Sequence, residues 1–319
     1  MLYSPTPLHI PDGFLSTAVS IMGWFLAVIF IGIALRQTKD QLGERQVPLM
    51  GILAAFIFAA QAINFPVAAG TSGHLLGGTL AAIVLGPWAG TLVMTAVIAV
   101  QALLFQDGGL LAMGWNILNM GVITAFTGFA VYILVVRLLG ATTRARLIGG
   151  FVGAWGSVVV SATATAIELA ISGTSPLHLG LPAMAGVHAI IGLGEAVITV
   201  GAIGLLQASR PQVLTTGEMA PGRGTATFTL VGLLIALGVS AFSPLASAHP
   251  DGLEFIAELQ GFLGLAQDPS YVLMPDYTLP FLSDPVLTTM LAVAVGTLVV
   301  FGLAWLIARN SVQREAVGD

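Results

Sequence analysis

The sequence predicts an all-α polytopic membrane protein, a helical bundle of about nine transmembrane segments arranged as seven plus two. Two observations support this fold class. Of the 319 residues, 56% are hydrophobic and 8% are charged, whereas a soluble domain carries about 25% charged residues. The apolar residues also gather in long runs. This composition argues against a soluble enzyme, a nucleic-acid-binding protein and a disordered scaffold.

Eight apolar runs are long enough to cross a bilayer, which takes roughly 20 residues. A ninth run, 73–86, is shorter and rich in glycine, and we interpret it as a short span, a tilted span or a re-entrant helix. The eight long runs are 14–35, 47–65, 88–106, 110–136, 148–171, 184–207, 226–246 and 286–308.

The basic residues predict how the chain is oriented. All ten Lys and Arg residues fall in four clusters, and the alternate connections hold none. Because basic residues prefer cytoplasmic loops, we expect the N-terminus outside and the C-terminus in the cytoplasm, in a bacterial-type cytoplasmic (inner) membrane. The clusters are Arg36, Lys39 and Arg45; Arg137, Arg144 and Arg146; Arg210 and Arg223; and Arg309 and Arg314.

Composition also divides the chain. A polar stretch with Pro and Gly, 208–225, reads as a cytoplasmic linker between a seven-helix membrane domain, 1–207, and a two-helix domain, 226–319. The two helices of the second domain enclose an outer loop, 247–285, with six acidic residues. That loop either attracts cations electrostatically or is an ordinary solvated loop.

The sequence offers little for catalysis. It has no Cys, no P-loop, no GxGxxG and no HExxH. We therefore expect no catalytic residues, and a transporter that hydrolyses ATP would have to borrow a partner's ATPase. Of the five histidines, His74 lies where an outer loop dips into the membrane. Its imidazole either binds a metal or bonds a carbonyl at a broken helix, and composition alone leaves these equal.

Three stretches then resemble a known family: HIPDGFLS (His9–Ser16), NFPVAAGTSGHLLGG (Asn64–Gly78) and GWNILNMG (Gly114–Gly121). They are similar to the CbiM/NikM family, the substrate-specific membrane components of energy-coupling-factor transporters for cobalt or nickel. AHPDGLEFIAE (Ala248–Glu258) resembles the PDGLE segment of the small CbiN/NikN component. The resemblance implies ATP-driven import of Co(II) or Ni(II), with a transmembrane coupling protein and ATPase subunits as partners and no cofactor.

The resemblance also implies a metal site. Family chains begin Met-His, and the ion takes the terminal amine, the second residue's amide nitrogen and imidazole, and the imidazole of the TSGH motif. On this chain the ligands become Leu8, His9 and His74. Four nitrogens in a plane suit Ni(II), although the sequence leaves nickel and cobalt both open. Because an internal Leu8 has no free amine, we expect translation to start at a UUG or CUG codon there, which leaves residues 1–7 out of place.

Polar residues near these motifs are candidates for orienting the ligands. Asn64 and Asn116 rank first, and interhelical hydrogen bonding is an equal alternative. A rival function uses the face shared by His188 and Glu195 as a proton relay in a self-sufficient proton-coupled divalent-cation carrier. The alternative for that pair is a packing hydrogen bond.

Overall fold

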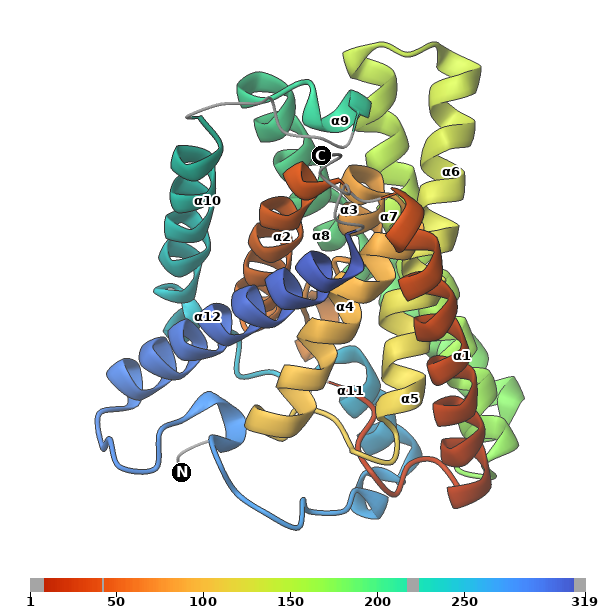
Figure 1. Ribbon diagram of the computed structural model, residues 1–319. Coiled ribbons are helices and arrows are strands. Elements are labelled where there is room, and N and C mark those ends of the chain that lie inside the picture. The colour runs from red at the N-terminus through yellow and green to blue at the C-terminus, as the bar shows by residue number, and fades with distance from the viewer. Residues whose placement is uncertain (1–8, 42, 217–223, 313–319) are drawn as a thin grey trace.

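The computed structural model describes residues 9–41, 43–216 and 224–312, and it confirms the polytopic helical membrane bundle (Figure 1). Within these residues seven helical stretches are long and apolar enough to cross a membrane. They contain α1 (Thr17–Gln41), α4 (Pro87–Val100), α6 (Thr124–Leu139), α7 (Thr143–Ile171), α8 (Leu177–Ser209), α10 (Gly224–Ser240) and α12 (Pro285–Ser311).

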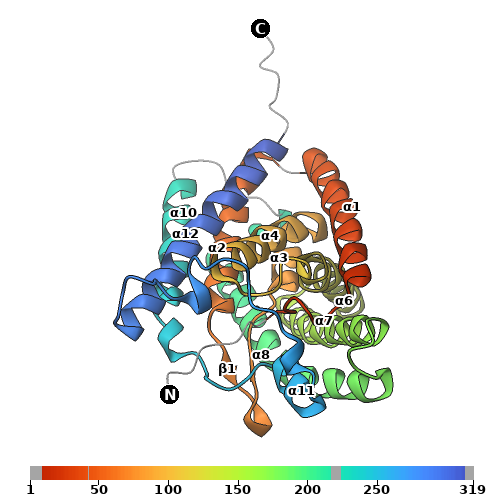
Figure 2. The same ribbon diagram turned by 90° about the horizontal axis from the view of Figure 1, so that it is seen from below.

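Two of the predicted segments are shorter helices. The run 47–65 contains α2 (Val47–Gln61), which is almost wholly buried, and the run 73–86 contains α3 (Gly78–Leu85). At about 1.5 Å per residue, neither helix matches the roughly 30 Å of a hydrocarbon core by itself. Both lie at the centre of the bundle, where other helices replace lipid around them (Figures 1 and 2).

The helix that follows α4 and the one that precedes α6 are irregular. A π-helical turn, Gln101–Phe105, ends α4, and Gln106 then takes a left-handed backbone conformation with φ of 56°. After α5 (Met113–Asn116), a second π-helical stretch, Ile117–Ile123, leads into α6. π-Bulges are frequent at functional sites. The two irregular stretches flank the loop that contacts the N-terminal segment.

The remaining elements are short. An antiparallel pair, β1 (Phe65–Pro66) and β2 (Ser72–Gly73), aligns Phe65 with Gly73 and carries the chain inward to His74. α9 (Val213–Thr216) follows α8, and α11 (Gly252–Gln260) lies in the outer loop. Short 3₁₀ turns are Glu44–Gln46, Ala68–Gly70, Ser243–Leu245, Leu263–Leu265 and Pro275–Tyr277.

The two C-terminal membrane helices are part of the same bundle as the others. Both α10 and α12 pack against α2, and α12 also packs against α4 (Figure 2). The α6–α7 connection and α9 lie at one end of the molecule, whereas α11 lies at the opposite end. Three basic residues of the predicted cytoplasmic side, Arg137, Arg144 and Arg146, therefore lie at the end remote from α11.

Candidate metal site

The N-terminal segment is fixed by side chains that bond its backbone. Asn116 accepts a hydrogen bond from the Ile10 N–H and donates one to the Ile10 carbonyl, each over 3.1 Å. The Asp12 carboxylate accepts from three successive backbone N–H groups, those of Leu110, Leu111 and Ala112, over 2.9–3.0 Å. These bonds satisfy N–H groups at the broken start of α5. Together with the two Asn116 bonds, they fix the position of the backbone that follows His9.

The loop that carries His74 is held just as closely. The Glu195 carboxylate on α8 accepts hydrogen bonds from the backbone N–H groups of Leu76 (2.5 Å) and Gly77 (3.0 Å). The Gln61 side chain donates to the Leu76 carbonyl over 2.7 Å. His74 Nδ1 lies 2.9 Å from the Leu75 carbonyl oxygen, which as the acceptor places the ring proton on Nδ1. The remaining ring nitrogen, Nε2, then carries a free lone pair.

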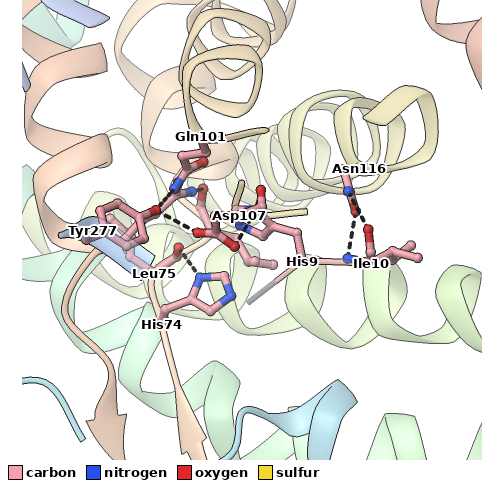
Figure 3. Close-up of polar contacts among 10 residues, drawn as sticks. His9, Ile10, His74, Leu75, Gln101, Asp107, Asn116 and Tyr277 are labelled. Carbon is pink, nitrogen blue, oxygen red and sulfur yellow. Dashed lines mark hydrogen bonds and ion pairs between the residues drawn. The ribbon is translucent and has the colours of Figure 1, made fainter. Parts of the chain in front are cut away.

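His9 and His74 meet inside the protein (Figure 3). Their ring centroids are 5.4 Å apart at 77°, and both side chains are buried. His9 Nδ1 lies 3.2 Å from the Asp107 carbonyl oxygen and 3.4 Å from its carboxylate, and its Nε2 is buried without a hydrogen-bond partner. Imidazole nitrogens are good ligands for Ni, Cu and Zn. Two buried imidazoles at this separation can both act as ligands to one ion.

Both rings line one cavity of about 60 Å³. His188, Asn116, Asn119 and Asp251 line it as well, so residues far apart in the sequence meet at this cavity. Within the described residues, no three His, Asp or Glu side chains come close enough together to hold an ion by themselves. An ion bound between the two imidazoles would therefore need donors other than these side chains.

Asp107 connects His9 to the C-terminal part of the chain. The Tyr277 hydroxyl donates to Asp107 Oδ2 over 2.6 Å and accepts from the Gln101 side chain over 3.2 Å (Figure 3). Burial, with the Asp107 charge beside it, raises the pKa of Tyr277 above its usual value, so the hydroxyl keeps its proton. Sequence reasoning missed both residues. A charged residue directly after an apolar run, as in FQDGG, was the available signal.

Part of the outer loop covers the cavity. Ser72 donates to the Pro250 carbonyl through its backbone N–H (2.8 Å) and to the His249 carbonyl through its hydroxyl (2.7 Å). Asp251 caps α11 by accepting from the Glu254 N–H over 2.7 Å. Asp251 is buried, and burial raises its pKa to about 8. This part of the loop therefore packs against the protein beside the cavity, and α11 lies next to α8 (Figure 2).

The other predicted residues lie as follows. Leu8 falls outside the described residues. Asn64 accepts from the Ser247 N–H through its backbone carbonyl and is not among the residues that line the cavity. His188 Nδ1 bonds the Met184 carbonyl over 2.8 Å. Among the described residues, no hydrogen bond or ion pair joins His188 to Glu195, which bonds the His74 loop instead.

The fold and this cavity define a class, a polytopic helical membrane protein with two buried imidazoles at one end of the bundle. The sequence assigns the family. Residues 9–213 match the family described as "Cobalt uptake substrate-specific transmembrane region" (CbiM), and residues 226–311 match the PDGLE domain. The chain belongs to the CbiM family, and it is a membrane component for cobalt or nickel transport with a fused PDGLE domain.

Relatives and solved structures agree with this assignment. The chain is 36% identical to the fused protein NikMN of Archaeoglobus fulgidus, over 95% of this chain and 98% of that one. It is 32% identical to the cobalt transport protein CbiM of Sorangium cellulosum, over 67% of this chain and 99% of the relative. A crystal structure of a transition metal transporter matches 63% of this chain and 92% of its own, with 36% identity and a TM-score of 0.55.

Proposed function

We propose that this protein is the substrate-capture subunit of an ATP-driven energy-coupling-factor importer and takes up Ni(II) or Co(II) from the outer side. The observation that carries the proposal is the meeting of His9 and His74, from distant parts of the chain, at a buried cavity. ATP hydrolysis then belongs to partner subunits, because the sequence has no P-loop. A transmembrane coupling protein completes the assembly.

The proposed ligands are the His9 and His74 imidazoles and the backbone nitrogens of Leu8 and His9. Two imidazoles leave an ion short of donors, and the His9 backbone nitrogen belongs to a residue that lines the cavity. If the His9 backbone nitrogen and the His9 imidazole bind the same ion, the imidazole atom that completes the chelate ring is Nδ1, because it is nearer the backbone than Nε2. That atom lies 3.2 Å from the Asp107 carbonyl oxygen, so an ion bound to it would replace this contact.

The proposed topology places the N-terminus outside and the C-terminus in the cytoplasm of a bacterial-type inner membrane. The basic α6–α7 connection and the cavity covered by α11 lie at opposite ends of the bundle, in accord with the preference of basic residues for the cytoplasmic side. In the proposed division of labour, 1–207 captures the ion, 208–225 is a cytoplasmic linker, and 226–319 covers the site from outside. The family matches over 9–213 and 226–311 support these boundaries.

Titration of the purified protein with Ni(II) and with Co(II) tests the ligands. We expect His9→Ala and His74→Ala each to weaken binding by more than about 100-fold, because even residues that only support a ligand contribute 10–100-fold. His178→Ala is the matched control, since His178 is an exposed histidine at the start of α8. A chain that starts with Met at position 8 should bind more tightly than one that keeps residues 1–7. Unchanged binding by His74→Ala would overturn the site.

Cellular uptake separates this proposal from the rival carrier. If the partner ATPase supplies the energy, deletion of that ATPase abolishes accumulation of ⁶³Ni(II) or ⁵⁷Co(II). A carrier driven by protons through His188 and Glu195 keeps its uptake in the same strain and loses it when the proton gradient is dissipated. Survival of uptake without the ATPase would favour the carrier.

A further inference from the structure

The Glu195 carboxylate has an unusual position for a charged group in a membrane protein. It lies within the long membrane helix α8 with only 1% of its surface exposed. Ionisable groups at this depth are costly, and they persist where something compensates the charge. Here the compensation comes from two backbone N–H groups, one on each carboxylate oxygen, at 2.5 and 3.0 Å.

Those two N–H groups belong to a break between elements. Leu76 follows the β1–β2 hairpin, and Gly77 is the N-cap of α3. Backbone N–H groups at a helix start have no partner within the helix, and an apolar environment offers no water to replace one. The carboxylate also lies at the positive end of the helix dipole. Glu195 and the break in the chain therefore stabilise each other.

The same backbone positions the proposed ligand His74. Its ring is bonded to the carbonyl of Leu75, the residue next to the Glu195-bound N–H of Leu76. Gln61 holds the Leu76 carbonyl from the other side. Gly77 has φ of +83°, and a Cβ there would lie 2.6 Å from Ile57. The Leu76 N–H, the Leu76 carbonyl and the Gly77 backbone are therefore all fixed. These contacts fix the direction of the Leu75 carbonyl, and with it the direction of the His74 imidazole that is bonded to it.

We propose that Glu195 is a positioning residue for the metal site, which fixes the direction of the His74 imidazole by accepting the N–H groups of Leu76 and Gly77. This inference rests on the proposed role of His74 as a ligand and deepens it. It also gives the carboxylate a role other than proton relay, because both oxygens are engaged by backbone donors.

Glu195→Gln in the full-length purified protein is the primary test. The glutamine oxygen accepts one N–H, but its NH₂ group faces the second N–H and repels it. We expect Ni(II) affinity to fall by about 10-fold or more, with a shifted ligand-field absorption band for the ion that still binds. Glu168→Gln is the matched control. Glu168 is a second buried carboxylate on the neighbouring helix α7, and it bonds the Asn119 side chain rather than the His74 loop. This control should bind within about 2-fold of the parent.

Several outcomes decide the matter. Parent-like affinity and absorption in Glu195→Gln would overturn the inference, as would equal losses in both variants. If Glu195→Gln does not fold, Glu195→Asp serves instead, because it keeps the charge but is too short to reach both N–H groups. Parent-like binding by Glu195→Asp would also overturn the inference. Failure of the parent protein to bind Ni(II) or Co(II) would instead remove the proposed function itself.

Discussion

Around the two histidines, polar side chains bond mainly to backbone. Asp12, Asn116 and Glu195 each bond the main chain of a segment far away in sequence. In a membrane bundle such partners are needed wherever a helix breaks, because unsatisfied N–H and C=O groups are costly away from water. The sequence predicted polar residues near the motifs. It gave no sign of which backbone group each would meet, since that depends on how the helices pack.

The raised pKa of Asp251 leads to a prediction at the same scale. Its pKa rises from 3.8 to about 8 on folding, so between those pH values unfolding releases a proton and stability falls as pH rises. Asn at this position also caps a helix but does not titrate. We expect the free energy of unfolding of the parent, measured relative to Asp251→Asn, to fall by roughly 2–5 kcal/mol between pH 4 and pH 8.

Thermal unfolding in detergent at several pH values measures this dependence. Asp268→Asn, at an exposed position in the same loop, is the control and should follow the parent at every pH. If the difference in free energy of unfolding between the parent and Asp251→Asn did not change with pH, the Asp251 carboxyl would have the same pKa in the folded and unfolded states, contrary to this prediction.

Among the elements, the long membrane helices were predictable and the short ones were not. Within the part of the chain that the structure describes, length and hydropathy located the seven long helical stretches. The same criteria predicted longer segments where α2 and α3 lie. An apolar run looks the same whether it faces lipid or other helices. Only packing decides that α3 ends after eight residues between Gly77 and Gly86.

Close packing around α3 makes a prediction for that element. A Cβ at Gly78 would lie 2.5 Å from the Met120 carbonyl oxygen and closer still to Thr124 Oγ1. Overpacking of this kind costs about 1–3 kcal/mol, so Gly78→Ala should lower the thermal midpoint. At Gly156 on α7 a Cβ meets nothing within 4 Å. Gly156→Ala should therefore be neutral or stabilising by up to about 1 kcal/mol. Equal effects of the two substitutions would contradict this packing.

At the scale of the whole molecule, contacts join the CbiM region to the PDGLE region. Tyr277, from the loop between α10 and α12, stacks on Phe105 with ring centroids 4.7 Å apart and bonds Asp107 beside His9. Asp276 and Tyr277 both have positive φ, at 51° and 56°. Such backbone costs free energy, and the surrounding contacts must maintain it. The PDGLE region is thus tied to the environment of a proposed ligand.

Removal of one hydroxyl tests this link. Tyr277→Phe leaves the stacked ring in place but removes one hydrogen-bond donor from the buried Asp107 carboxylate. We expect a loss of about 1–3 kcal/mol in the free energy of unfolding. Tyr271→Phe is the control from the same loop, because the Tyr271 hydroxyl bonds the Leu103 carbonyl at an exposed position. It should cost no more than about 0.5 kcal/mol. A similar small effect of both substitutions would show that the Tyr277 bond contributes little.

The sequence alone determined that this protein lies in a membrane, where its long apolar helices lie and which family it resembles, because composition and local motifs are properties of adjacent residues. His9 and His74 were named from those motifs. Only the tertiary structure decided that their rings adjoin, that Asp107 and Glu195 support them, and that Asp251 and Tyr277 reach them from the far end of the chain. Residues so far apart in sequence share no local pattern. Their contacts arise from helix packing, which buries each polar group beside whichever partner the fold brings to it.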